Sequence, residues 1–320
     1  MSGSRSESAT TNHTMAALPA SPRNLGLALA WLLVGVMLMS GTAFAGRPCE
    51  QRRLSIEEMS NGINLAAQTA AALKDHNVQV GVIARAGQDL SKWGQRYSHL
   101  GIVYLEDLSG GEPVWRVVHK LNECGSDGAD VYRQGLAEFF MEAPHEWKAA
   151  VVPLAPAVAE EVLPSLSSRQ RLTRLHEPRY SMVAYAWGTR YQQSNQWAIE
   201  TLAMLLEPRV QTRGQAQRWL REMAYQPDRL RLGTFTRLGA RMTKANVAFD
   251  DHPAGLRFSG RIDTTTADSV LRWLERSSLG EARFVVRLDL QRAYGGGVTA
   301  PTRDHRPVGS SADRNAEMEL

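Results

Sequence analysis

The chain has 320 residues, of which 43% are hydrophobic and 22% charged, so it can bury the core of one fair-sized domain or two small ones. Its net charge of +4 comes from scattered arginines rather than from a basic block, which argues against a nucleic-acid partner. We expect no cofactor.

The N-terminus has the features of a secretory signal peptide. An apolar run ends in Ala43-Phe44-Ala45, which has the A-x-A form of a cleavage signal. We predict a signal peptide over residues 1–45, with cleavage after Ala45, and a periplasmic or secreted mature protein. The alternative is an uncleaved membrane anchor, because residues 25–45 are about long enough to span a bilayer.

Two cysteines, Cys49 and Cys124, follow the predicted cleavage point. An even number of cysteines in an oxidising compartment favours a Cys49–Cys124 disulfide that ties the new N-terminus to a loop. Two unpaired thiols are the alternative. Cys124 is a weak candidate nucleophile, since no predicted helix begins there to lower the pKa of its thiol.

The mature chain is predicted to alternate helices with strands. Periodicity predicts, in chain order, a helix over 54–75, strands over 78–85, 98–105 and 114–119, a helix near 131–142, a strand over 148–153 and a helix over 156–175. Together with a helix that begins at Ser194, these elements predict one α+β domain over 46–294, with an antiparallel sheet. Residues 295–320 are rich in Gly, Pro and charge and are predicted to form a disordered tail.

Ser194 stands at the predicted start of a helix over 194–206, whose apolar residues recur at helical spacing. The simplest interpretation is that its side chain caps the first turn. The other is functional, because the N-terminus of a helix also stabilises an anion or a developing oxyanion.

Two histidines lie on the strands predicted before that helix. His99 starts one strand, and Gly101 is expected to leave open space beside its ring for a neighbouring backbone or a substrate. His119 ends the next strand, and antiparallel pairing would bring it beside His99, where a second ring can orient a base. The alternative for each histidine is a purely structural role.

The segments GVIARAGQDLSKWGQRYSHLGIVY, VVH and TRYQQSNQWAIETL resemble, in their order, circularly permuted papain-like (NlpC-type) amidases and acyltransferases. More closely, the segments GQDLS, RYSH, HKLNECG and YQQSNQW, with the turn over 250–253, resemble a family of exported bacterial proteins known as domain of unknown function 2145. The first resemblance implies a permuted papain-like fold, an antiparallel sheet packed against the helix that carries the nucleophile.

That resemblance also implies roles for individual residues. His99 matches the general base, His119 the third polar position and Ser194 the nucleophilic cysteine. A serine hydroxyl is much less acidic than a thiol, so this departure is typical of a weakened or lost enzyme. Substrate-binding candidates are Gln193, Asn195 and Tyr191.

Two functional classes remain open. The preferred one is a non-catalytic module that binds a cell-envelope peptide, glycan or lipid; the other is a hydrolase or acyltransferase that uses Ser194, His99 and His119. The aromatic residues near this region, among them Trp187, are more often core, but an aromatic rim would suit a glycan or peptide. The turn Asp250-Asp251-His252-Pro253 has metal-ligand residue types, but adjacent residues on a turn point apart, so no metal site is expected.

Overall fold

The computed structural model describes residues 53–108, 110–142, 144–232 and 246–290. The predicted signal peptide, Cys49 and the predicted tail lie outside these ranges. Within them, no helix is both long and apolar enough to cross a bilayer.

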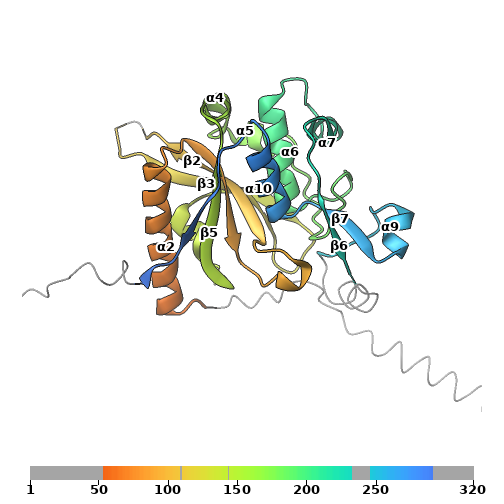
Figure 1. Ribbon diagram of the computed structural model, residues 1–320, viewed down its shortest axis with the longest axis horizontal. Helices are drawn as coiled ribbons and strands as arrows, with labels where there is room; N and C mark the ends of the chain where they lie inside the picture. The colour runs from red at the N-terminus through yellow and green to blue at the C-terminus, as the bar shows by residue number, and fades with distance from the viewer. Residues whose placement is uncertain (1–52, 109, 143, 233–245, 291–320) are drawn as a thin grey trace, which may run out of the picture.

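The centre of the fold is a six-stranded antiparallel sheet (Figure 1). Its strands run in the order β4-β3-β2-β1-β5-β8. Their bounds are β1 Val80–Ala86, β2 His99–Glu106, β3 Val114–Asn122, β4 Ala129–Gly135, β5 Glu146–Pro153 and β8 Phe284–Arg287. A separate two-stranded ribbon pairs β6 (Asp228–Arg231) with β7 (Arg261–Thr264). The antiparallel α+β architecture expected from the sequence is confirmed.

The sheet is covered on both faces because its central strands are apolar on both sides. One face packs against α2 (Ile56–Asp75) and the short α3 (Leu136–Phe140). The other packs against α4 (Pro156–Val162), α6 (Ser194–Leu206), α7 (Arg213–Glu222) and α10 (Ala267–Arg276). Figure 1 shows α2 on one side of the sheet and α6 with α10 on the other. In β2 the α6 face carries Leu100, Ile102 and Tyr104, and the α2 face carries His99, Gly101 and Val103.

Two predicted helices are wrong in part. Residues 129–135 form β4 and pair with β3, and only residues 136–140 are helical. The alternation of buried Ala129 and Val131 with more exposed neighbours is a strand pattern that the helical interpretation overlooked.

The helix predicted over 156–175 is broken into α4, a 3-10 turn over Leu163–Ser165 and α5 (Arg169–Thr173). Pro164 has no N–H to donate, and its ring clashes with the preceding turn of an α-helix. By contrast, α6 begins and ends where the sequence predicts, because its apolar residues are numerous and no proline interrupts them.

Candidate functional site

The first turn of α6 lies where β2 and β3 separate. The two strands pair with each other from Glu106 and Val114 as far as Ile102 and Val118. Beyond that point both strands continue but no longer pair with each other. On the β2 side, the Leu100 N–H donates to the Asn195 carboxamide oxygen at 3.1 Å. The N-terminus of α6 is therefore fixed beside the start of β2, one residue from His99.

On the β3 side, the Lys120 ammonium donates to the backbone carbonyl of Gln192 at 2.9 Å and to its side-chain oxygen at 3.0 Å. Lys120 also donates to the Glu177 carbonyl, so its three N–H groups have three oxygen acceptors. Burial lowers the pKa of Lys120 to about 7, with the Arg213 charge adding to this effect.

His99 and His119 meet as the antiparallel pairing predicts. His99 Nε2 lies 2.8 Å from His119 Nδ1, and the rings meet edge-on. His119 Nε2 lies 2.7 Å from the Gln134 side-chain oxygen on β4, and both rings contact Phe139 of α3. The predicted contact between the two histidines is confirmed, and Gln134 extends it to a third strand.

The hydrogen bonds define the proton positions in this chain of side chains. Burial, with the nearby Arg85 charge, lowers the pKa of His119 to about 3, so its ring is neutral. The Gln134 oxygen can only accept, so the proton of His119 is on Nε2. Its Nδ1 must then accept from the Nε2–H of His99. In a neutral His99 the proton is then on Nε2 and Nδ1 is unprotonated.

Of the two occupants expected for the space at Gly101, a neighbouring backbone and not a substrate fills it. A Cβ at this position would lie 2.7 Å from the Val117 side chain, 2.9 Å from the Val118 carbonyl and 3.0 Å from His119 Cβ. The glycine is needed because β3 approaches β2 closely there. It therefore allows the approach of His119 rather than access of a ligand.

Ser194 is not the N-cap of α6. Gln193 holds that position, and among the described residues no side chain caps the helix. The Gln193 amide N–H donates to Thr264 Oγ1 at 2.7 Å. The simple interpretation of Ser194 as a capping serine is therefore wrong. Ser194 is the first helical residue, 5% exposed, and its hydroxyl lies 3.5 Å from that of Tyr180. Within the described residues it makes no hydrogen bond to a histidine.

The candidate substrate-binding side chains already have protein partners. The Asn195 amide donates to the Thr265 carbonyl at 3.3 Å, and Gln193 is held by Thr264. Tyr191 donates its hydroxyl to Asp250 at 3.5 Å. In the structure the two amides anchor the first turn of α6, so any donor to a ligand carbonyl at this point would be a backbone N–H of that turn.

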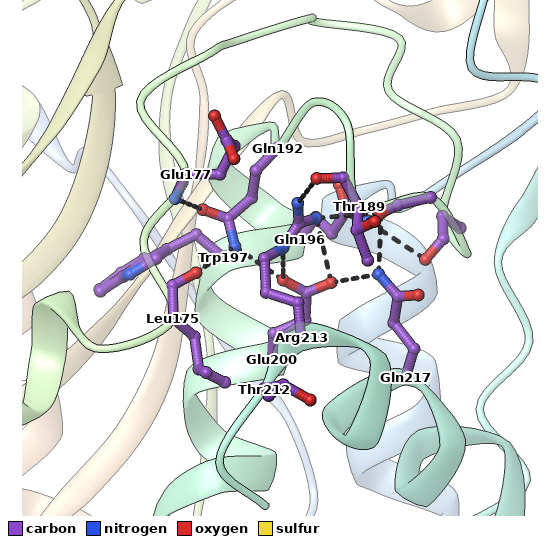
Figure 2. Close-up of polar contacts among 12 residues, drawn as sticks. Leu175, Glu177, Thr189, Gln192, Gln196, Trp197, Glu200, Thr212, Arg213 and Gln217 are labelled. Carbon is purple, nitrogen blue, oxygen red and sulfur yellow. Dashed lines mark hydrogen bonds and ion pairs between the residues drawn. The ribbon is translucent and has the colours of Figure 1, made fainter.

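Behind this turn lies a buried polar network that the sequence interpretation missed (Figure 2). Glu200, with no exposed surface, receives hydrogen bonds from Arg213 at 2.7 and 3.2 Å, from Gln217 at 2.7 Å and from Gln192 at 2.7 Å. Arg213 also donates to the carbonyls of Gly188 and Thr189. The signal in the sequence is one acidic residue within the otherwise apolar stretch of α6.

Two further sequence predictions can be placed. Cys124 lies in the exposed loop after β3, and its predicted partner Cys49 lies outside the described residues, so the disulfide stays a prediction. In the 250–253 turn, Asp251 accepts from the Tyr185 N–H at 2.8 Å and His252 Nε2 lies 2.8 Å from the Val183 carbonyl. These contacts hold the turn against the loop before α6. The described residues contain no group of three or more His, Cys, Asp or Glu arranged to hold a metal.

These features define an α+β protein in which an uncapped helix N-terminus meets a sheet that carries a hydrogen-bonded histidine pair. The chain belongs to the family described as "Uncharacterized protein conserved in bacteria (DUF2145)", whose family model matches residues 72–274. The matched region contains His99, His119 and Ser194. Neither a curated protein nor a solved structure matches the chain.

Proposed function

We propose that this chain is a non-catalytic binding module of the bacterial cell envelope, built on a permuted papain-like fold that has serine at the nucleophile position. The observation that carries the proposal is the partner of Ser194. Its hydroxyl lies 3.5 Å from the Tyr180 hydroxyl and, among the described residues, makes no hydrogen bond to an imidazole, and a serine without a hydrogen-bonded base is a poor nucleophile.

The proposed ligand group is a carbonyl or carboxylate of an envelope peptide, glycan or lipid. Since no side chain in the described part of the chain caps α6, an acceptor could bind the N–H groups of its first turn, and the helix dipole favours negative charge there. The histidine pair lies nearby, at the start of β2, but its rings face α3 on the other side of the sheet. The proposed recognition site is therefore the first turn of α6, held by the buried network behind it.

Export is part of this proposal. It rests on the apolar N-terminal run, the Ala43-Phe44-Ala45 cleavage signal and the even number of cysteines. Membrane attachment is proposed only for a chain in which the signal stays uncleaved.

A serine hydrolase or acyltransferase is the second candidate, and a specific observation favours it. The bonds from His99 to His119 and from His119 to Gln134 orient His99 as a base requires, with Nδ1 unprotonated in the neutral ring. The His99 ring faces α3 and α6 covers the other face of the sheet, so this arrangement would serve Ser194 only if both the imidazole and the first turn of α6 moved when a substrate bound.

A chemical labelling experiment separates the two candidates. In Ser194→Cys, the helix dipole and a protonated His99 would favour the thiolate, so we expect rapid alkylation by iodoacetamide near neutral pH. Adding His99→Ala should slow it. The wild-type protein is treated in parallel with a fluorophosphonate, and the labelled residue is identified by mass spectrometry.

The outcomes differ for each candidate. A reactive engineered thiol without fluorophosphonate labelling of the wild type supports the binding module. Labelling of Ser194 that is lost in His99→Ala supports the hydrolase and overturns the module. A thiol in Ser194→Cys that reacts no faster than free cysteine would show that neither candidate has the site in the right place.

A further inference from the structure

A second recognition feature lies between α7 and the β6–β7 ribbon. It is an open hollow of about 410 Å³. Its lining comprises Trp187 from the loop before α6, Arg221 from the end of α7, Tyr225, Gln226 and Pro227 from the turn that follows, and Arg229 and Asp263 from the ribbon. Neither histidine nor Ser194 contributes to it.

The aromatic floor of the hollow is rigid. Tyr225 is buried, and its hydroxyl lies 2.9 Å from that of Ser269 on α10. Its ring meets Trp187 edge-on at 5.9 Å and Trp273 edge-on at 5.7 Å. The residue after Trp187 is also held, because the Gly188 carbonyl accepts from Arg213 and Gln217 of the buried network. Both aromatic rings are therefore positioned before any ligand arrives.

The two arginines in the hollow have different partners. Arg229 is committed to Asp263 through two hydrogen bonds of 2.7 and 2.8 Å. The Arg221 guanidinium lies over the Trp187 ring, 4.2 Å from its centroid, and among the described residues no carboxylate is within ion-pair distance of it. Stacking uses the face of a guanidinium and leaves its edge, with the N–H donors, for an acceptor.

The charge of the hollow indicates the kind of acceptor. Arg221 and Arg229 contribute two positive charges and Asp263 one negative charge, which leaves a net charge of +1. A single carboxylate neutralises this charge and matches the forked donors of one guanidinium. A dianionic phosphate would leave excess negative charge beside Asp263.

We propose that this hollow binds a ligand with one free carboxylate next to an aromatic or aliphatic group, such as the C-terminal residue of a short peptide. Arg221 receives the carboxylate through its N–H edge, and the apolar group packs on the exposed parts of Trp187 and Pro227. Because stacking on Trp187 already restricts the Arg221 side chain, binding loses less side-chain entropy than it would with a free arginine. The site does not depend on whether Ser194 is catalytic.

The test compares N-acetyl-phenylalanine with its C-terminal amide, which is uncharged. Titration calorimetry on the mature protein, supported by tryptophan fluorescence, should give at least tenfold weaker binding for the amide. Arg221→Gln removes the charge and should weaken binding of the acid by at least tenfold. Arg218→Gln is the matched control, since Arg218 is exposed on the same helix but outside the hollow, and it should bind as the wild type does.

Three results would overturn the proposal. They are equal binding of acid and amide, undiminished binding by Arg221→Gln, and tighter binding of phenyl phosphate than of the carboxylate. Trp187→Phe provides a second variant that keeps an aromatic ring, and a reduced affinity for the acid is expected. Ser194→Ala should bind the acid normally, which separates failure of this site from failure of the function proposed for the α6 N-terminus.

Discussion

His99 Nε2 donates to His119 Nδ1 at 2.8 Å, at the point where β2 and β3 cease to pair. The direction of this bond follows from the neutral state of His119, whose other nitrogen donates to Gln134. A chain of three polar side chains, with the buried His119 at its centre, thus joins Gln134 on β4 to the partly buried imidazole of His99 on β2. Such a chain orients that ring whether it contacts a ligand or a nucleophile, so the histidine pair alone does not make the protein an enzyme.

The buried His119 should make folding sensitive to acid. Its pKa is about 3 in the folded chain against an ordinary value of 6.5, so the unfolded chain takes up the proton first. The contribution of His119 to the free energy of unfolding is constant above pH 6.5. It falls as the pH drops from 6.5 toward 3, by up to about 1.4 kcal/mol per pH unit. Urea unfolding of the wild type and of His119→Gln at pH 7, 6, 5 and 4 measures this contribution.

The acid-dependent loss should be smaller in His119→Gln, which cannot take up the proton. His76→Gln provides the control because His76 is an exposed histidine. The acid-dependent loss of stability of this variant should match that of the wild type. Equal slopes in the wild type and in His119→Gln would show that His119 is not held neutral by burial.

Replacing Glu200 by a neutral residue should lower the free energy of unfolding more than replacing any other single polar residue. Its carboxylate, with no exposed surface, pairs with Arg213, whose side chain is only 9% exposed. Glu200→Gln leaves that guanidinium buried without a counter-charge, and loss of one partner of such a pair costs about 3–5 kcal/mol. Chemical denaturation measures the loss. Glu207→Gln, which breaks the exposed pair with Arg209 at the end of the same helix, should leave the unfolding midpoint nearly unchanged.

Local patterns in the sequence were sufficient for β1, β2, β3, β5 and α6, because each depends on periodicity within a short window. They did not predict β6, β7 or β8. The meeting of His99 and His119 was also predictable, since a hairpin joins their strands. Gln134 was not, because residues 129–135 were interpreted as a helix and the partner of His119 lies on β4. For Gly101 the sequence left two uses open, a neighbouring backbone or a substrate, because it shows which residue lacks a Cβ but not which strand approaches it.

The buried network could not be assembled from the sequence. Glu200, Arg213 and Gln217 come from two helices, and Lys120 comes from a strand far from both in the chain. A charged residue within an apolar stretch shows that some partner exists, but the partner is selected by packing. The interpretation of Ser194 as a capping serine is wrong by one position. A capping serine stands just before the first helical residue, whereas Ser194 is itself the first helical residue.

Lys120 should make the protein more stable as the pH rises above neutrality. The pKa of its ammonium is about 7 in the folded chain against 10.5 ordinarily, so between these values the unfolded chain binds the extra proton. The free energy of unfolding therefore increases from pH 7 toward 10.5 relative to a chain without this group, by up to about 1.4 kcal/mol per pH unit. Comparing Lys120→Met with the wild type at pH 7.5, 8.5 and 9.5 tests this.

The difference between the two curves should grow with pH in favour of the wild type, whatever constant cost Lys120→Met incurs by leaving three oxygens without a donor. Lys92→Met, at an exposed position, should show no such divergence. A difference that stays constant across this range would mean that Lys120 keeps an ordinary pKa.

Gly101→Ala should separate β2 from β3 and disturb the histidine pair together with the sheet. The added methyl group would lie 2.9 Å from the Val118 carbonyl, and a backbone atom cannot move aside as the end of a side chain can. Strain of this kind typically costs about 1–3 kcal/mol. Because the same methyl group would lie 3.0 Å from His119 Cβ, the imidazole resonances of both histidines should shift in NMR spectra of the folded variant.

Gly214→Ala, in the first turn of α7 with nothing near the added methyl group, should fold at least as stably as the wild type and leave those resonances unchanged. If Gly101→Ala matched the wild type in stability and in both histidine spectra, then β3 would not approach β2 as closely as the structure places it, and the orientation inferred for His99 would lose its basis.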